Sequence, residues 1–379
     1  MVSDARSSAA PATRTEEAIL QRVTERADEW FPGVGARPVV GISPLTVRPR
    51  AQLYSVRVGC GSQQHRVLAK VRRNWPGAAR AAGARPRLAS QLLPAAELTA
   101  LEFGALTQIF TVFRGRAAGF GAIRPLDHLE AEDAILMEYV DAPTLREVLL
   151  RSSRFAPRVG PSSRRAPEDA WSRAGAWLRI FQRQVPGDGL PARQATREEV
   201  VDRFEAFGDF LAGRLGARAV GDAARIGAQL AADVLPPLLP LAVGHGDYAP
   251  RNVFLLRDGR VAVFDPLTRW RVPRFEDLSR FLVALRLQGT QVHTHGASYG
   301  AKGLDARERA VIEGYCDDEP VRPAELRCYQ LLITLDKWAA LVDSPSRGWP
   351  ARLRQASLQR AAGYVRGETR RLVELVHSA

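Results

Sequence analysis

The eight residues from His245 to Asn252, HGDYAPRN, place a carboxylate and an amide five positions apart, directly before the apolar run VFLL. Phosphoryl transfer uses such a pair of side chains, because an Asp orients the attacking hydroxyl while an Asn and a second Asp hold the magnesium ion that bridges the nucleotide phosphates. A turn between a helix and a strand also favours Asp, Asn and Pro. The octet alone leaves both interpretations open, so the other parts of such a site must be sought elsewhere in the chain.

A second carboxylate follows the octet at the end of a predicted hairpin. The run VFLL is followed by Arg257–Arg260, RDGR, and then by VAVFD, which ends at Asp265. Two apolar runs joined by Asp-Gly are the strongest short-range signal for a β-hairpin. The hairpin returns the chain to the octet, and we therefore expect Asp265 beside Asn252 as a second metal ligand. The alternative is a carboxylate that only caps a turn.

The chain contains only three lysines, Lys70, Lys302 and Lys337, among 54 basic residues. Lys70 lies near the end of an alternating run, residues 65–71, that predicts a strand, and a second alternating run covers residues 53–58. In a sequence that otherwise uses arginine, a retained lysine indicates a need for a compact point charge, which suits a phosphate contact. A strand-end lysine that reaches into solvent is the alternative.

A lysine of this kind requires a carboxylate to hold it, usually from the following helix. Residues 94–110 carry apolar side chains at helical spacing and contain two candidates, Glu97 and Glu102. We favour Glu102, because its surroundings in the sequence are more apolar and a buried carboxylate needs a partner. A solvated charge on the helix surface is the alternative for either glutamate.

Together, these residues resemble the aminoglycoside phosphotransferase and choline kinase-like family of small-molecule kinases, which has a protein kinase-like fold. The catalytic loop of that family reads HGDxxxxN, and its metal-binding Asp follows soon after. Asp247, Asn252 and Asp265 match these positions, and Lys70 matches the strand lysine of the family. The segment Ile135–Asp141, ILMEYVD, resembles the hinge between the two lobes of these enzymes.

The resemblance, which covers residues 40 to 345, implies an α+β, two-lobed protein kinase-like fold with an antiparallel β N-lobe, a mostly helical C-lobe and a site between them. It implies ATP and Mg²⁺ as cofactors. Asp277, in FEDLSRF, resembles the family residue that braces the catalytic loop from below. The expected site comprises a catalytic base, Asp247; nucleotide contacts from Lys70, Glu102, Glu138 and Val140; the metal ligands Asn252 and Asp265; and structural support of the catalytic loop from His245 and Asp277.

The chain departs from the expected patterns at three places. Residues 46–54, where a loop over the phosphates is expected, contain no GxGxxG, so backbone cradling of the phosphates is not evident. Asp265 is followed by Pro-Leu rather than Phe-Gly, and the loop lacks the His-Arg-Asp of protein kinases, which argues against a protein substrate. Arg251 stands where related sequences commonly have a small residue or Trp, and its cation either reaches an anion of the substrate or faces solvent.

Length and composition fit two lobes with substantial cores, since the 379 residues are 46% hydrophobic. We expect a nucleotide-binding N-lobe at residues 16–140. Residues 141–379 are expected to form a C-lobe with the catalytic loop and the substrate-binding helices. Residues 1–15 predict a disordered tail, and the arginine-rich residues 151–167 predict a flexible insertion.

The net charge of +13 invites a nucleic-acid partner, but arginine is spread along the whole chain and no nucleic-acid motif appears, so none is expected. The positive electrostatic field that this net charge creates is poorly matched to a polycationic aminoglycoside unless acidic residues are concentrated locally. An anionic or neutral acceptor is not repelled by it. Residues 317–319, DDE, are either such a local patch or a solvated helix terminus.

Three widely spaced cysteines, the absence of a long apolar run and a polar start without a signal-peptide core predict a cytoplasmic protein without a membrane span. The oligomeric state stays open. We predict an ATP-dependent phosphotransferase that transfers the γ-phosphate to a hydroxyl of a small molecule, such as a sugar, amino sugar, nucleoside or amino alcohol. The alternative is a catalytically silent kinase-like protein that binds nucleotide or an anionic partner in a regulatory role. Retention of every expected ionic residue argues for the enzyme.

Overall fold

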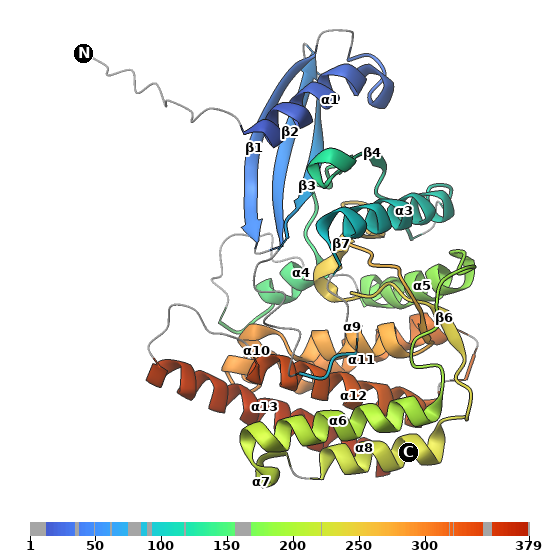
Figure 1. Ribbon diagram of the computed structural model, residues 1–379, viewed down its shortest axis with the longest axis vertical. Coiled ribbons are helices and arrows are strands. Elements are labelled where there is room, and N and C mark those ends of the chain that lie inside the picture. The colour runs from blue at the N-terminus through green and yellow to red at the C-terminus, as the bar shows by residue number, and fades with distance from the viewer. Residues whose placement is uncertain are drawn as a thin grey trace. The chain divides into compact units, whose positions relative to one another are not determined.

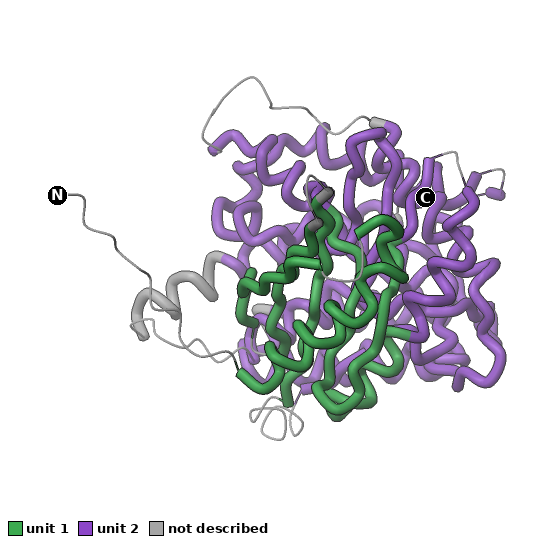
Figure 2. Tube along the Cα trace, turned by 90° about the horizontal axis from the view of Figure 1, so that it is seen from above, with its two compact units in different colours: residues 1–75, 93–103, 123–140 green, residues 76–92, 104–122, 141–379 purple. Residues whose placement is uncertain are grey.

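The chain forms two compact units, which Figure 2 shows in different colours. Unit 1 comprises residues 1–75, 93–103 and 123–140, and unit 2 comprises residues 76–92, 104–122 and 141–379. The computed structural model describes residues 13–34, 38–48, 50–60, 63–74, 85–88, 93–116, 119–155, 168–220, 222–317, 319–320, 322–343 and 351–377. Residues 76–92 and 104–122, which the sequence analysis assigned to the N-lobe, thus belong to unit 2.

Unit 1 is built on an antiparallel sheet with the strand order β1-β2-β3-β5-β4 (Figure 1). The strands are β1 (Val39–Arg48), β2 (Ala51–Cys60), β3 (Gln63–Arg72), β4 (Pro125–Leu129) and β5 (Ala134–Glu138), and a 3-10 turn, η1 (Glu130–Glu132), joins the last two. Both predicted strands are confirmed as parts of β2 and β3. These two strands pair over their whole length, from Ala51 opposite Arg72 to Cys60 opposite Gln63.

Helix α1 (Arg14–Trp30) covers one face of this sheet with a single apolar stripe. Ile19, Val23, Ala27 and Trp30 recur at helical spacing, and they are buried in one cluster with alternate residues of β2 and β3. The stripe therefore supplies the helical half of the core of unit 1.

Helix α1 begins inside the segment, residues 1–15, that the sequence analysis predicts to be a disordered tail. Thr13 and Glu16 form a capping box, in which each side chain accepts a hydrogen bond from the backbone N–H of the other residue. Residues 13–15 are therefore the cap and first turn of α1, and the prediction of a disordered tail is wrong for them. The rest of that tail, residues 1–12, lies outside the described residues.

Helix α3 (Ala95–Phe113) confirms the helix predicted over residues 94–110, and its first turns belong to unit 1. Side chains alternate across a strand, so Lys70 and Arg72 of β3 point away from the face on which Ala69 packs with α1. Glu102 of α3 meets these two cations on the opposite face. The sheet of unit 1 thus has an apolar face and a face that carries buried charges.

Unit 2 is mostly helical, and Figure 1 labels its helices. With the later part of α3, its helices are α4 (Leu145–Arg151), α5 (Glu168–Gln184), α6 (Arg197–Leu215), α7 (Ala217–Val220), α8 (Ala223–Val234), α9 (Glu276–Arg286), α10 (Gly289–His293), α11 (Ala301–Cys316), α12 (Pro323–Val342) and α13 (Ala351–His377). Its short strands form two antiparallel pairs, β6 (Leu241–Val243) with β9 (Arg271–Pro273) and β7 (Val253–Leu255) with β8 (Val261–Val263). The sheet of unit 1 and the helices of unit 2 confirm the predicted α+β fold class.

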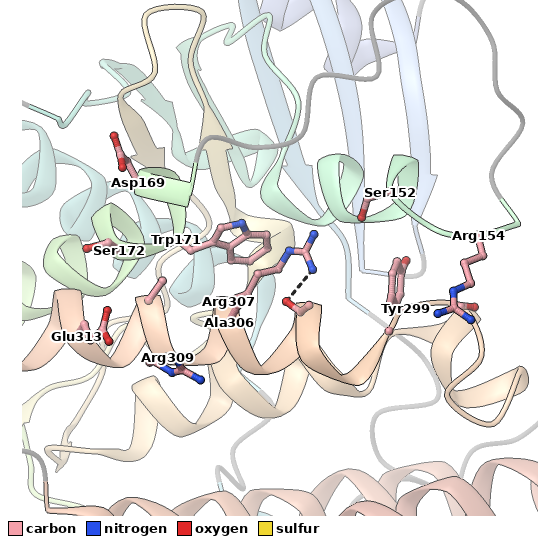
Figure 3. A pocket seen from close by; sticks show the side chains of 14 residues that line it. Ser152, Arg154, Asp169, Trp171, Ser172, Tyr299, Ala306, Arg307, Arg309 and Glu313 are labelled. Atoms are coloured by element: carbon pink, nitrogen blue, oxygen red, sulfur yellow. Dashed lines mark hydrogen bonds between the residues drawn. The ribbon is translucent and has the colours of Figure 1, made fainter.

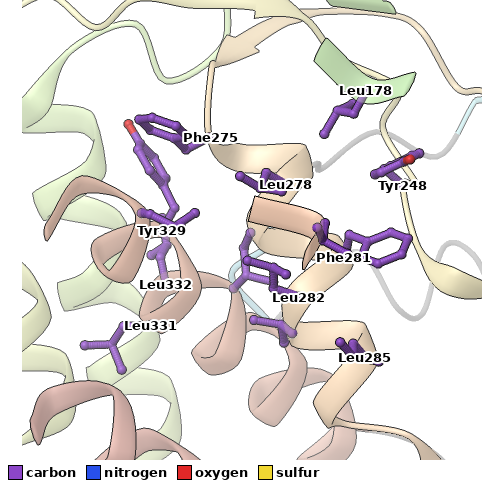
Figure 4. Close-up of a cluster of buried hydrophobic side chains, with 14 of the residues drawn as sticks. Leu178, Tyr248, Phe275, Leu278, Phe281, Leu282, Leu285, Tyr329, Leu331 and Leu332 are labelled. Atoms are coloured by element: carbon purple, nitrogen blue, oxygen red, sulfur yellow. The ribbon is translucent and has the colours of Figure 1, made fainter. Parts of the chain in front are cut away.

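An apolar stripe of α9 lies in the core of unit 2 (Figure 4). Leu278, Phe281, Leu282 and Leu285 follow helical spacing, and all four side chains are buried. Figure 4 draws them with Leu331 and Leu332 of α12 and with Leu178 and Tyr248. The start of α9 is therefore held by apolar packing from several segments of the chain.

Helices α5 and α11 approach so closely that their backbones touch. A Cβ atom at Gly175 of α5 would overlap the carbonyl of Val311, and one at Gly314 of α11 would overlap the carbonyl of Ser172. Glycine weakens a helix interior by roughly 1 kcal/mol relative to alanine. The two glycines are needed here because no side chain fits between the helices.

The predicted insertion at residues 151–167 lies mostly outside the described residues. Arg151 is the last residue of α4, so this position is helical, and residues 156–167 belong to the part of the chain that the structure does not describe. The flexibility of the insertion stays a prediction. Within the described ranges, no helix combines the length and the apolar character that crossing a membrane requires.

Candidate active site

The octet HGDYAPRN follows β6 and leads through a 3-10 turn, η2 (Pro250–Asn252), into β7. Gly246 has a φ of 81°, in the left-handed region that favours glycine. A Cβ atom at this position would meet the carbonyl of Leu267 at 2.7 Å. The backbone N–H of Leu267 donates to the carbonyl of His245 at 2.8 Å. Glycine at position 246 therefore lets the octet run against the segment that contains Leu267.

Asp277, in the first turn of α9, anchors the octet. Its Oδ2 accepts the backbone N–H of His245 at 2.5 Å, and its Oδ1 accepts that of Gly246 at 3.3 Å. The carboxylate is buried, and burial together with the charge of the neighbouring Glu276 raises the pKa of Asp277 to about 6. The carboxylate of Asp277 therefore holds the backbone at the start of the octet.

The imidazole of His245 is fully buried among aromatic rings. Trp177, Phe181 and Tyr248 contact it in edge-to-face geometry, with centroid distances of 6.1, 5.9 and 5.5 Å. Its Nδ1 accepts the backbone N–H of Asp247 at 3.4 Å, while its Nε2 has no hydrogen-bond partner among the described residues. Burial lowers the pKa of His245 to about 4. The ring is therefore neutral near pH 7, and it shapes the loop from the inside.

Both carboxylate oxygens of Asp247 are engaged by residues later in the octet. Oδ2 accepts a hydrogen bond from Nδ2 of Asn252 at 3.1 Å, and the same Nδ2 donates to the carbonyl of Asp247 at 2.8 Å. Oδ1 forms an ion pair with the guanidinium of Arg251. The side chain of Asp247 is 30% exposed. The carboxylate is thus oriented by its neighbours and remains reachable from solvent.

The predicted hairpin is confirmed, and it brings the chain back to Asn252. Val253 of β7 pairs with Val263 of β8, and the N–H of Phe264 donates to the carbonyl of Asn252 at 3.1 Å. Asp265 follows directly with a φ of 59°, a left-handed conformation that Asp adopts more readily than most residues. The turn at Asp265 therefore ends the hairpin next to the octet.

Asn252 and Asp265 offer the oxygen donors that Mg²⁺ prefers. Asn252 uses its amide nitrogen on Asp247, so its amide oxygen points away from that carboxylate. Mg²⁺ is usually held by one or two such protein groups, and phosphates and water complete its shell. The donor set therefore fits Mg²⁺ bound together with a nucleotide. A site of this kind needs no cluster of three His, Cys, Asp or Glu side chains, and the described residues contain none.

In unit 1, Glu102 lies between two cations of β3. Lys70 Nζ is 2.5 Å from Glu102 Oε1, and Arg72 donates to Oε2 from Nη2 at 2.6 Å and from Nε at 3.2 Å. Glu102 is fully buried, whereas Glu97 is exposed. The expected pairing of Lys70 with Glu102 is present. The sequence analysis missed Arg72, although its place two residues after Lys70 put both cations on one face of the strand.

The expected hinge begins in β5 and continues to Val140. Glu138 is the last residue of β5, and its backbone N–H donates to the carbonyl of Arg124 at 2.9 Å. The N–H of Tyr139 donates to the carbonyl of Arg66 at 3.1 Å. Of the two residues expected to meet adenine, Glu138 therefore has only its carbonyl to offer, while Val140 remains a candidate donor.

A pocket of about 660 Å³ opens on unit 2 near the ends of α4, α5 and α11 (Figure 3). Its wall includes Trp171, over whose ring the guanidinium of Arg307 stacks at 5.7 Å from the centroid. The ring of Trp171 contacts Phe281, and Phe281 contacts Tyr248. Among the described residues that line the pocket, none belongs to the octet. Aromatic core residues thus connect the pocket wall with Tyr248.

A model of the phosphotransferase enzyme family matches residues 94–312, more than half of the chain. The chain belongs to this family. The matched span contains Glu102, the octet and Asp265, whereas Lys70 precedes it. The match confirms both the family and the class of enzyme that the sequence motifs of this phosphotransferase predict. No curated protein sequence matches the chain.

Solved structures of the same fold share little sequence identity with this chain. A spectinomycin phosphotransferase in complex with ADP and spectinomycin is 13% identical, with a TM-score of 0.51 over 88% of this chain and 93% of that one. The macrolide 2'-phosphotransferase of Brachybacterium faecium is 12% identical, with a TM-score of 0.51 and coverages of 92% and 97%. The ethanolamine kinase of Plasmodium vivax is 8% identical, with a TM-score of 0.51 and coverages of 94% and 89%. These similarities confirm the kinase-like fold.

Proposed function

We propose that this phosphotransferase transfers the γ-phosphoryl group of ATP to a hydroxyl group of a small molecule, with Mg²⁺ as the metal cofactor. Its family supports phosphoryl transfer as the reaction. The ADP bound to the similar spectinomycin phosphotransferase supports an adenine nucleotide as the donor. The acceptors named for the similar structures include ethanolamine, which is an alcohol.

Lys70 is the proposed contact of the α- and β-phosphates. A compact ammonium suits this task, and the buried Glu102 orients it. Because Arg72 holds the second oxygen of Glu102, the carboxylate cannot rotate away from Lys70 without breaking an ion pair. The strand and helix of unit 1 would therefore present Lys70 in one orientation.

Adenine would be recognised by backbone groups of the hinge. In an extended backbone, the carbonyl of one residue and the N–H of the second residue after it point to the same side. The carbonyl of Glu138 and the N–H of Val140 form such a pair, which matches the neighbouring donor and acceptor on the Watson–Crick edge of adenine. The N–H of Glu138 has no part in this, because the carbonyl of Arg124 accepts it.

Asn252 and Asp265 would hold Mg²⁺ through the Asn amide oxygen and the Asp carboxylate. The bound ion would neutralise negative charge on the phosphate oxygens during transfer. Asp247 would orient the acceptor hydroxyl and take its proton. The hydroxyl oxygen would bond to the γ-phosphorus as the bond to the β,γ-bridging oxygen breaks, and ADP would leave. Asp277 and His245 would keep the loop that carries Asp247 in place.

The observation that carries this proposal is the junction of the octet and the hairpin. Asn252 holds Asp247 through its amide nitrogen, and its carbonyl holds the residue before Asp265. Asn252, itself a proposed metal ligand, thus links the proposed base, Asp247, with the other proposed ligand, Asp265. The test is ATP turnover by the full chain with Mg²⁺ and a panel of sugars, amino sugars, nucleosides and amino alcohols, compared with turnover by Asp247→Asn.

The rival function is a catalytically silent protein that binds nucleotide for regulation. Both functions predict Mg²⁺-dependent binding of ATP, so binding alone does not separate them. Formation of ADP that requires an acceptor, and that is lost in Asp247→Asn, would support the enzyme. Binding of ATP without ADP formation across the whole panel would support the rival.

A further inference from the structure

The cation that pairs with Asp247 in this phosphotransferase has more N–H donors than this ion pair uses. Arg251 follows Asp247 by four positions and forms an ion pair with Oδ1. A guanidinium has five N–H donors in a planar fork, which can hold a carboxylate or a phosphate through two hydrogen bonds. The side chain of Arg251 is 44% exposed, so part of this fork faces solvent beside the proposed base.

A second cation lies in the same surroundings. Lys337, on α12, is one of the three lysines of the chain, and its ammonium makes no hydrogen bond or ion pair with the described residues. Burial and the nearby Arg280 lower the pKa of Lys337, the charges of Asp336 and Asp247 act in the opposite direction, and Arg251 adds to the lowering. Lys337 therefore lies within electrostatic reach of Asp247. The side chain of Lys337 is only partly buried, so a ligand can still reach its ammonium.

The described acidic residues of the 317–319 patch are ion-paired and so do not favour a cationic acceptor. In the described part of the 317–319 patch, Asp317 pairs with Arg179 at 2.7 Å, and Glu319 pairs with Arg183 and Arg274. The patch is therefore an ion-paired helix terminus. On α12, the carboxylate of Asp336 lies 3.4 Å from Arg85.

We propose that the acceptor carries an anionic group, a carboxylate or a phosphate, that Arg251 and Lys337 bind. This inference rests on the proposed function and names the acceptor class for the same site. In the structure, Arg251 occupies Oδ1 of Asp247. An acceptor anion would take over Arg251 and release that oxygen for the acceptor hydroxyl. Binding of the anion would thus prepare the base for proton transfer.

The experiment compares four hexoses that differ in one group: glucose, glucosamine, glucuronate and glucose 6-phosphate. Their affinities for the full chain are measured by calorimetry in the presence of Mg²⁺ and ADP. We expect the carboxylate or the phosphate compound to bind at least about tenfold more tightly than glucose and glucosamine, because a charge-assisted hydrogen bond is worth about that factor or more. Comparison of the two anions identifies the preferred group.

Three variants connect this preference to the residues. Arg251→Gln should reduce the affinity for the preferred anion by about tenfold or more, while the affinity for glucose stays the same. Lys337→Met should reduce the anion affinity to a smaller extent. The matched control is Arg257→Gln, which removes the same charge from a side chain that is 86% exposed and pairs with Asp141 at 3.1 Å. This control should bind all four compounds like the parent protein.

Any one of three results would overturn the inference. The first is binding of the two anions that is absent or no tighter than binding of glucose and glucosamine. The second is an anion affinity that Arg251→Gln leaves unchanged. Phosphorylation of a neutral or cationic acceptor in preference to every anionic one would also overturn it and would leave the proposed function standing. Loss of phosphoryl transfer in the acceptor panel, by contrast, concerns the proposed function.

Discussion

The carboxylate of Asp277 accepts the backbone N–H of His245 at 2.5 Å, across 32 positions of sequence. This bond connects the loop that carries Asp247 to the first turn of α9, whose apolar stripe is buried in unit 2. The position of the proposed base therefore depends on a helix that does not itself carry any of the proposed reacting groups.

Replacement of Asp277 by Ala should lower both stability and turnover. The backbone N–H groups of His245 and Gly246 would lose their acceptor, and an unsatisfied buried donor costs about 1 to 3 kcal/mol. We expect the free energy of unfolding in urea to fall by about 2 kcal/mol or more, and kcat to fall more than the affinity for ATP. Asp188→Ala, at an exposed turn, serves as the control. Normal kcat in a folded Asp277→Ala protein would contradict the anchoring role.

Replacement of Asp247 and replacement of Asp265 should impair the enzyme in different ways. Asp247→Asn keeps one oxygen that can accept the hydrogen bond of Asn252 but removes the base and its ion pair with Arg251, so MgATP should bind as in the parent protein while turnover falls by about a hundredfold or more. Asp265→Ala removes a metal ligand and should weaken the binding of MgATP itself. Calorimetry with MgATP and steady-state turnover of the same preparations separate the two effects. Equal MgATP affinity in both variants would remove Asp265 from the metal site.

The triad of Glu102, Lys70 and Arg72 makes a prediction about stability. Lys70→Met should abolish most phosphoryl transfer but cost little stability, because Arg72 still neutralises Glu102. Glu102→Gln leaves two cations facing a neutral amide, and the loss of one partner from a buried ion pair costs about 3 to 5 kcal/mol. Urea unfolding should therefore show a much larger loss for Glu102→Gln. The reverse order would mean that Arg72 does not share the carboxylate.

His245 should make stability depend on pH. Its pKa is lowered by burial from the ordinary value of 6.5 to about 4, so the unfolded chain binds a proton below pH 6.5 that the folded chain refuses until about pH 4. This residue therefore removes about 3 kcal/mol of stability as the pH falls through that window. Asp277 acts in the opposite direction, because its raised pKa makes the folded chain hold a proton between its ordinary pKa of 3.8 and about 6.

The two effects oppose each other in the parent protein, so a variant is needed to separate them. His245→Asn should be less stable than the parent at pH 7, because the packing of the ring is lost. Its disadvantage in urea unfolding should shrink by about 3 kcal/mol between pH 7 and pH 4, because it has no imidazole to protonate. A constant difference across this range would show that His245 does not titrate as its burial requires.

Local signals of the sequence predicted much of the fold and of the candidate site. The Asp-Gly turn predicted the hairpin that returns to Asn252, and apolar context selected Glu102 over Glu97 as the partner of Lys70. The start of α1 was missed although Thr13 and Glu16 form the T-x-x-E signal of a capping box.

Other features depend on contacts between distant parts of the chain, and no local pattern reveals them. The assignment of residues 76–92 to unit 2 is one example, since Arg85 contacts Asp336 far along the chain. The second cation on Glu102 was visible as an Arg two residues after Lys70, but its pairing required the position of α3. The pairing of Arg251 with Asp247 was not among the alternatives that the sequence analysis weighed, because it depends on side-chain geometry that spacing leaves open.

The backbone contact between α5 and α11 supports the octet, although neither helix carries a proposed reacting group. Tyr248 of the octet donates its hydroxyl to the carbonyl of Ala174 at 2.6 Å, one residue before the glycine of α5 that packs on α11. A single methyl group added at Gly314 must push α5 away, and this movement would shift the carbonyl of Ala174 that holds Tyr248. In a random-mutagenesis screen for activity, substitutions at position 314 should therefore be among the most damaging. Selecting positions by their distance from Asp247 would not identify this one.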